Sequence, residues 1–357
     1  MNADEKRKMK LEKELALTPV CNFLEDYQAD LGDGTKKYRG LVSGFTEVDD
    51  LMSGLDRFIL LAGRSGAGKT TLALQLGLGV AERGTPVIVY SLEMCRAEII
   101  TKLLQVIAHE QYRYDIYANS IDLRGNDPKL DKQTKEVLGS SIEHLNEVGK
   151  LIYVRDSVNG VPNILDYDGD KKQKIKSIYQ DVVEAKTKHK ADRVLVLIDS
   201  VQDIVKAENA QQTQAEVSAL ADLTILQQQT GATILATAQK NKASTTSGDD
   251  YADVMGSMSY IHKPNTVLML DTPREMLTAV GKGGKGGLTK DQQQLLRDIE
   301  NEGREGGVRP MLLKTIKGRF TGTKAIPLTY YGAYSYFTGG KSDRYLDFYQ
   351  NCGLIDD

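Results

Sequence analysis

The sequence has few of the residues that build disulfide frameworks or metal clusters. Its 357 residues include only three cysteines, Cys21, Cys95 and Cys352, and four scattered histidines. Because the cysteines lie far apart and show no paired spacing, the sequence encodes neither a disulfide framework nor a zinc site. With 40% hydrophobic and 27% charged residues, the composition is that of an ordinary globular protein that can bury a real core.

Long apolar runs are also absent. Nowhere do 18 apolar residues follow one another, and the amino-terminal stretch "MNADEKRKMKLEKEL" is charged. We therefore expect a cytoplasmic protein with neither a signal peptide nor a membrane span. The formal net charge of -3 argues against a surface that coats nucleic acid by bulk electrostatics, although a small basic channel inside an assembly would not show in that sum.

Three regions are expected along the chain. Residues 1–39 are polar and charged, and they form either a solvated arm or linker, or a helix that docks on a neighbouring subunit. Residues 40–341 alternate strand and helix signals, which predicts an α/β fold with a mostly parallel twisted sheet, flanking helices and antiparallel strands at the carboxyl-terminal end. Within them, the glycine-rich residues 279–309 are expected to be a mobile surface insertion. Residues 342–357 are expected to be a tail.

The strand signals are short apolar runs, and the helix signals are apolar residues at helical spacing. The predicted strands cover residues 58–63, 85–91, 150–157, 192–200, 231–239, 265–271, 309–318 and 325–337. Helices are expected over residues 68–83, 95–110 and 209–231.

The clearest motif lies between the first predicted strand and the first predicted helix of this region. "GRSGAGKT" fits the phosphate-binding pattern G-x-x-x-x-G-K-[ST], with the required strand before it and helix after it. Its glycines let backbone N–H groups face phosphate oxygens, and the helix start adds a positive dipole. We expect Lys69 to reach the β and γ phosphates of ATP and the Thr70 hydroxyl to coordinate Mg²⁺. The predicted nucleotide-binding residues are Gly63, Arg64, Ser65, Gly66, Ala67, Gly68, Lys69, Thr70 and Thr71.

Two acids end other predicted strands. Asp199 follows the run "VLVLI", where an aspartate that holds Mg²⁺ belongs, and a helix cap is the alternative interpretation. Glu93 follows "VIVYSL", and one interpretation is that it complements the dipole of the next helix, worth about 0.5 kcal/mol. The other places Glu93 at the end of a strand next to the P-loop strand, where it orients the water that attacks the γ phosphate.

Further motifs carry a family resemblance. The segments "LVSGFTEVDDLMSGL", "YSLEM", "VLVLIDSVQDI", "ATAQKNK" and "IKGRFTGTKAIPLTYYGAYSYF" occur in family order around the P-loop. With them, the chain from about Gly40 to Phe337 resembles the RecA-like motor domain of DnaB-type replicative helicases. The same core is similar to RadA and to circadian KaiC-type ATPases. Because only residues 1–39 precede the motor region, we expect the family's usual amino-terminal helical domain to be absent.

The resemblance implies roles for four residues. Glu93 corresponds to the catalytic glutamate, and Gln239 to the residue that senses the γ phosphate and links it to the DNA-binding loops. Lys317 and Arg319 match a K-x-R pair that reaches the neighbouring subunit's nucleotide, where a cation stabilises charge on the transferring phosphoryl group. A homo-hexameric ring follows from this arrangement. The alternatives are a solvated basic pair for Lys317 and Arg319, and a polar strand end for Gln239.

The resemblance also locates the DNA contacts, near residues 239–259. Lys240, Lys242 and Ser257 are expected to bind single-stranded DNA there. The region departs from the family pattern in two ways, because it lacks the arginine often found beside the channel motif and carries several acids. These acids are Asp249, Asp250 and Asp253.

The leading interpretation is an ATP-hydrolysing, ring-forming helicase or translocase that acts on single-stranded DNA in replication and is of a phage, plasmid or mobile-element type. The first alternative is a RecA-like or KaiC-like regulatory or assembly ATPase that binds DNA or protein without unwinding, which the acidic loop favours. The second is a small-molecule P-loop kinase, which needs a lid and acceptor pocket rather than a K-x-R pair acting in trans. Mg²⁺ and ATP are the expected cofactor and substrate. Single-stranded DNA and further copies of the chain are the expected partners, with a loader or primase left open.

Overall fold

The computed structural model describes most of the chain beyond residue 37. The described residues are 38–118, 130–156, 160–165, 176–205, 212–240, 258–281, 289–305, 307–318 and 324–353, together with Val20, Leu24, Val158 and Gly322. The chain divides into two compact units, Met1–Lys37 and Tyr38–Asp357, and all the helices and strands named below belong to the second.

A single sheet organises the second unit. Within the described residues it has nine strands in the order β3-β2-β4-β5-β1-β6-β7-β8-β9. The strands are β1 Phe58–Gly63, β2 Val87–Ser91, β3 Ile152–Asp156, β4 Leu195–Asp199, β5 Thr233–Gln239, β6 Thr266–Asp271, β7 Val308–Gly318, β8 Ala325–Tyr331 and β9 Tyr336–Gly339. Every pairing from β3 to β6 is parallel, whereas β6–β7, β7–β8 and β8–β9 are antiparallel. The predicted α/β fold with an antiparallel carboxyl-terminal end is confirmed.

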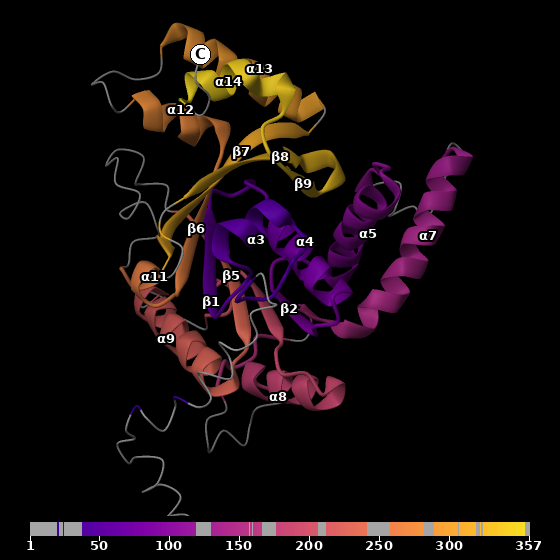
Figure 1. Ribbon diagram of the computed structural model, residues 1–357, viewed down its shortest axis with the longest axis vertical. Coiled ribbons are helices and arrows are strands. Elements are labelled where there is room, and N and C mark those ends of the chain that lie inside the picture. The colour runs from indigo at the N-terminus through magenta and orange to yellow at the C-terminus, as the bar shows by residue number, and fades with distance from the viewer. Residues whose placement is uncertain are drawn as a thin grey trace, which may run out of the picture. The chain divides into compact units, whose positions relative to one another are not determined.

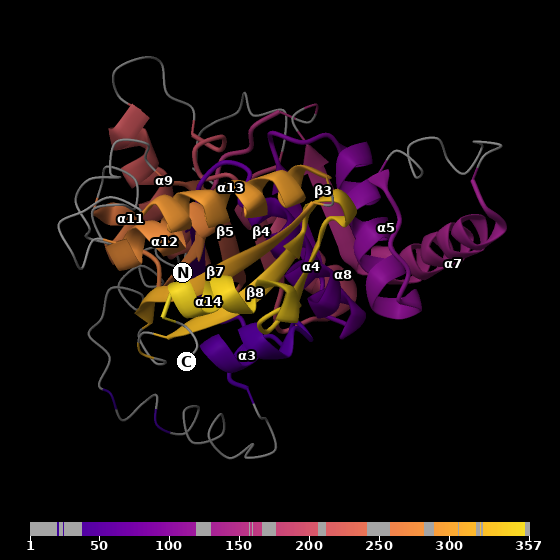
Figure 2. The same cartoon turned by 90° about the horizontal axis from the view of Figure 1, so that it is seen from above.

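Helices lie against this sheet on both sides (Figures 1 and 2). They are α3 Thr46–Met52, α4 Lys69–Glu82, α5 Arg96–Tyr112, α7 Lys132–Val148, α8 Ile178–His189, α9 Gln212–Thr230, α11 Ser259–His262, α12 Pro273–Gly281, α13 Lys290–Glu305 and α14 Leu346–Asn351. Short 3-10 turns occur at Gly149–Leu151, Gly332–Tyr334 and Asp343–Tyr345. No helix within the described ranges is long and apolar enough to cross a bilayer.

The apolar strands are buried on both faces, which explains their near-continuous hydrophobic runs. In β2, Val87 and Val89 point into the core cluster shared with helices α4 and α5. Ile88 and Tyr90 point to the opposite face, into the cluster shared with α8 and α9. This alternation is the two-residue period of a strand. Because the strands are packed on both faces, their carboxyl ends are held together at one edge of the sheet, where the ligand sites of such sheets lie.

The stretch 279–309 is not a poorly packed insertion throughout, and that expectation is wrong for residues 290–305. They form α13, in which Leu296 and Ile299 are buried in a small cluster with Phe348 and Tyr349. Helices α12, α13 and α14 gather beside β7 around this cluster (Figure 1). The physical reason is that "QLLRDIENE" keeps apolar residues at helical spacing between its glycine-rich neighbours. Residues 282–288 and 306 lie outside the described part of the chain.

Candidate nucleotide and metal site

The P-loop joins β1 to α4 and has the backbone that its glycines permit. Gly66 and Gly68 have φ angles of 75° and 91°, in the left-handed region that favours glycine. At Gly68, the residue before α4, an added Cβ would also lie 2.7 Å from the ring of Phe337. Ser65 and Gly66 are exposed, so the start of α4 presents its backbone to solvent as a phosphate site requires.

Lys69 is held against its own loop. Its Nζ donates a hydrogen bond to the Arg64 carbonyl oxygen at 2.9 Å, and the residue is 8% exposed. Burial lowers the pKa of Lys69, and three carboxylates oppose that shift. In order of effect they belong to Asp199, Glu93 and Glu275. The P-loop lysine therefore lies within electrostatic reach of both acids singled out in the sequence.

Asp199 ends β4 and is buried. Its Oδ2 accepts a hydrogen bond of 2.7 Å from Thr70 Oγ1, and its Oδ1 accepts one from Thr237 Oγ1. The structure thus brings together the two residues expected to hold Mg²⁺. A hydroxyl beside one carboxylate fits Mg²⁺, which binds oxygen ligands and is usually held by one or two carboxylates together with substrate phosphates and water. Among the described residues, no group of three His, Cys, Asp or Glu side chains forms a separate metal site.

Glu93 lies two residues beyond β2, in an exposed turn between that strand and α5. The turn is fixed beside Asp199 because the Leu92 N–H donates to the Asp199 carbonyl at 3.2 Å. Ser91 Oγ also donates to the Met94 carbonyl at 3.2 Å. These bonds hold the Glu93 backbone against the end of β4.

Two expectations about Glu93 are corrected. Glu93 is not the acid in the first turn of the next helix, because α5 begins at Arg96 and its first-turn acid is Glu98, which accepts the Cys95 N–H at 2.8 Å in a capping box. The strand before Glu93 is also not next to the P-loop strand, since β4 and β5 separate β2 from β1. Glu93 still comes near Lys69 because all these parallel strands end at the same edge.

Gln239 ends β5 opposite Gly63 of β1, which places it at the same edge as the P-loop. Its side chain is exposed. Lys240 follows it, and its N–H donates to the Gly63 carbonyl at 3.0 Å. The Lys240 side chain is only 8% exposed and lies 3.1 Å from Glu275, so the expectation that it offers its charge to DNA does not match its placement. Lys242 and Ser257, the other expected DNA contacts, lie outside the described residues.

Lys317 is also placed differently from either interpretation of the K-x-R pair. Its Nζ donates to the carbonyl oxygens of Ile261, His262 and Pro264 at 2.8, 2.9 and 2.7 Å. It therefore binds the last turn of α11 and the residues after it, within its own chain. In this chain the Lys317 ammonium is therefore bound to three carbonyls rather than fully solvated. Arg319 lies outside the described residues.

Sequence reasoning missed two charged residues at this edge. Lys102 of α5 donates to Thr71 Oγ1 at 3.3 Å and to Ser335 Oγ at 3.2 Å. Burial lowers the pKa of Lys102, against the opposing effect of Asp199. Glu275 of α12 forms an ion pair with Arg64 of the P-loop at 3.3 Å. Neither belongs to a local motif, so only the folded chain reveals them.

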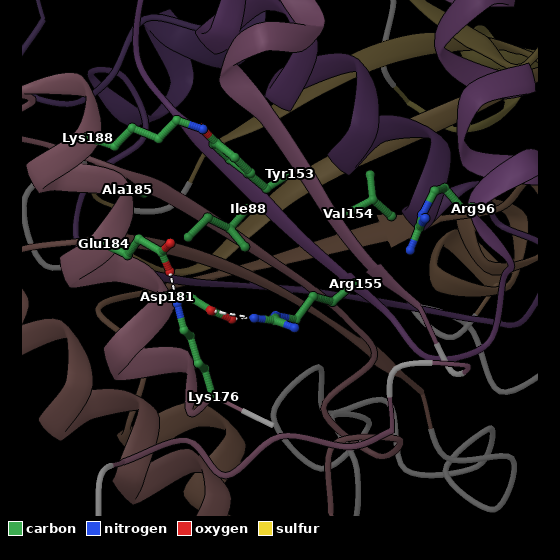
Figure 3. A pocket seen from close by; sticks show the side chains of 10 residues that line it. All are labelled: Ile88, Arg96, Tyr153, Val154, Arg155, Lys176, Asp181, Glu184, Ala185 and Lys188. Carbon is green, nitrogen blue, oxygen red and sulfur yellow. Dashed lines mark hydrogen bonds and ion pairs between the residues drawn. The ribbon is translucent and has the colours of Figure 1, made fainter. Parts of the chain in front are cut away.

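A pocket of about 380 Å³ lies elsewhere, between the edge strand β3 and helix α8 (Figure 3). Arg155 Nε and Nη2 donate to the Asp181 carboxylate at 2.5 and 2.6 Å, and the Tyr90 hydroxyl donates to it at 2.7 Å. Lys176 pairs with Glu184 at 2.5 Å. Because these charges are matched and no P-loop residue lines the pocket, we assign it no part in nucleotide binding.

The fold and the site together define a RecA-like P-loop domain. Its nine-stranded sheet, mapped over the described residues, carries the P-loop after β1 and the buried Asp199 at the end of β4. Residues 40–274 match the family model of the DnaB-like helicase C terminal domain, and the chain belongs to this family.

Solved structures share the fold. The ATPase domain of G40P is 18% identical, with a TM-score of 0.67, and the match covers 91% of this chain and 100% of that one. A DnaB-like replicative helicase, described together with its interactions with primase, is 19% identical with a TM-score of 0.65, covering 91% of this chain and 68% of that one. At these identities the likeness shows the fold alone. Among curated protein sequences, none matches significantly.

Proposed function

We propose that the protein is an ATP-hydrolysing, ring-forming motor that moves on single-stranded DNA during replication, of a phage, plasmid or mobile-element type. One observation carries the proposal. In a DnaB-like domain, the Thr70–Asp199 pair lies beside Lys69, and the Glu93 carboxylate acts on the same lysine. Hydrolysis of a nucleoside triphosphate requires these groups close together in one site.

Each group has a defined task in this proposal. The backbone of the P-loop and Lys69 bind the phosphates, and Thr70 and Asp199 hold Mg²⁺, which neutralises charge on the phosphate oxygens. Glu93 accepts a hydrogen bond from the attacking water and orients it. Its exposed turn leaves room for that water, while the Leu92–Asp199 bond fixes its position. Gln239, at the same edge, senses the γ phosphate.

The ring supplies the remaining cation. With Lys317 bound to carbonyls of its own chain, we assign the trans role to Arg319 alone. A guanidinium suits this role because it stays charged and can bind phosphate oxygens with two donors. A head-to-tail arrangement of identical subunits, proposed here as a hexamer, places one such arginine at every nucleotide.

Glu93→Gln tests the catalytic assignment. We expect ATP turnover to fall about 100-fold or more, as for loss of a positioned general base, while ATP still binds. Glu136→Gln is a matched control, because Glu136 is an exposed glutamate of α7 that pairs with Lys132 at 3.5 Å. Turnover should be measured with and without single-stranded oligonucleotide. Wild-type turnover that does not respond to DNA, with no ring in electron micrographs, would contradict the motor.

A regulatory or assembly ATPase that binds DNA or protein without unwinding remains the second candidate. The placement of Lys240 favours it, because this expected DNA contact is paired with Glu275. The acids Asp249, Asp250 and Asp253 of the same region add to that argument. Strand displacement on a forked substrate separates the two functions, since only the motor opens the fork.

A further inference from the structure

Glu275 is fixed in orientation by the start of its own helix. It is the third residue of α12, and its Oε2 accepts hydrogen bonds from the Thr272 N–H at 3.0 Å and the Thr272 Oγ1 at 2.9 Å. This is the capping geometry of a helix amino terminus, so the carboxylate is held without help from the nucleotide site. Glu275 is also one residue beyond the part of the chain that matches the family model.

The other carboxylate oxygen of Glu275 faces two cations, one directly after β1 and one directly after β5. Oε1 lies 3.3 Å from Arg64 Nε and 3.1 Å from Lys240 Nζ. The side chains of Glu275 and Lys240 are each only 8% exposed, so solvent screens their interaction little. Removing one partner of such a buried group leaves the others with an uncompensated charge.

The two cations begin the two segments that a motor must connect. Arg64 opens the P-loop after β1, and Lys240 opens the segment after β5 that the sequence assigns to DNA. These strands are neighbours in the sheet, and the Lys240 N–H is bonded to the Gly63 carbonyl. Glu275 therefore lies across the ends of both strands and touches each by one ion pair.

The charge of the Glu275 carboxylate also acts on neighbouring ionisable groups. The carboxylate of Glu275 raises the pKa of Lys69, against the larger lowering by burial. It also adds to the raised pKa of Asp271, which burial causes first and which Lys314 opposes from 2.7 Å. Because Arg64 and Lys240 face the same oxygen of Glu275 at 3.3 and 3.1 Å, a change of charge at Arg64 acts on Glu275 and through it on Lys240.

We propose that Glu275 is a positioning residue that couples the occupancy of the P-loop to the segment beginning at Lys240. The phosphates of a bound nucleotide compete with Glu275 for Arg64 and leave its Oε1 to Lys240, while Oε2 stays bound to Thr272. Binding of DNA near Lys240 acts on the same carboxylate in the reverse direction, because coupling between two sites is reciprocal. This inference rests on the proposed function, since it takes single-stranded DNA as the second ligand.

Glu275→Gln in the full chain tests it. Glutamine still accepts the Thr272 hydrogen bonds, so α12 keeps its start. The measured quantity is the ratio of dissociation constants for a fluorescent, non-hydrolysable ATP analogue without and with a single-stranded oligonucleotide. We expect this ratio to be about 5 to 150 in the wild type, the usual range of coupling between sites, and to fall close to about 1 in the variant.

Two further variants complete the test. Lys240→Met reaches the same link from β5 and should lower the ratio alike, and adding it to Glu275→Gln should lower it no further, as for residues of one network. Glu300→Gln removes an exposed carboxylate paired with Arg274 at 3.9 Å and should keep the wild-type ratio. A Glu275→Gln protein with the full wild-type ratio overturns this inference alone. A wild type that does not bind the oligonucleotide overturns the proposed motor as well.

Discussion

Replacing Lys317 by methionine separates two roles that its motif allows. The structure gives its ammonium three carbonyl acceptors, at Ile261, His262 and Pro264, between 2.7 and 2.9 Å away. A hydrogen bond to a charged group contributes about 1.5–3 kcal/mol, but three bonds to one ammonium are not additive, and water can reach the exposed His262 region. We therefore expect Lys317→Met to lower the free energy of unfolding by about 2–4 kcal/mol.

Urea unfolding followed by far-ultraviolet circular dichroism measures this loss, because the chain has no tryptophan to report by fluorescence. Lys324→Met, at an exposed position just before β8, is the matched control and should keep the wild-type midpoint. The anchoring role is wrong if Lys317→Met is as stable as the wild type and assembles normally but no longer hydrolyses ATP. That result would return the lysine to the neighbouring subunit's nucleotide.

Two smaller changes test the rest of the site and core. Thr237→Val removes the hydroxyl that donates to Asp199 Oδ1. We expect ATP turnover at limiting Mg²⁺ to fall about 10- to 100-fold, as for loss of a group that orients a metal ligand. An unchanged dependence of turnover on Mg²⁺ concentration would contradict this. Burial raises the pKa of Glu110 while a 2.9 Å bond from Gln75 opposes the shift. The folded state therefore binds more protons than the unfolded state above the ordinary glutamate pKa, and stability falls as pH rises through the raised value. Glu110→Gln should flatten this dependence in unfolding curves, and an equal slope in both proteins would refute it.

The sequence predicts most of the sheet because its parallel strands are covered on both faces. Runs such as "FILLAG" and "VIVYS" have no polar face, and the observed strands Phe58–Gly63 and Val87–Ser91 follow them closely. The P-loop is equally local, since its glycines and its flanking strand and helix are contiguous. The sequence pattern does not predict helix α8, and the glycine-rich segments on both sides of α13 favour a loop where this helix forms.

The order of the strands and the contacts between distant residues are not local properties. Nothing in "YSLEM" shows that β4 and β5 lie between β2 and β1. The ion pairs of Glu275 likewise join β1, β5 and α12, which are far apart along the chain. Likewise, nothing in "IKGRF" indicates that Lys317 binds the carbonyls of Ile261, His262 and Pro264, in and just after α11. Motif reasoning therefore finds the P-loop, whose residues are contiguous, but it does not find the partners of cations when those partners come from other elements.

Asp199 contacts three parts of the site. Its carboxylate accepts hydrogen bonds from Thr70 of α4 and Thr237 of β5, and its main-chain oxygen accepts one from Leu92 in the turn that carries Glu93. The turn that carries Glu93 is consequently linked through Asp199 to both Thr70 and Thr237. A side-chain substitution at Asp199 removes the two carboxylate contacts but leaves the main-chain hydrogen bond from Leu92 in place. Because one residue makes all three contacts, any displacement of Asp199 would disturb Thr70, Thr237 and the Leu92 turn at the same time.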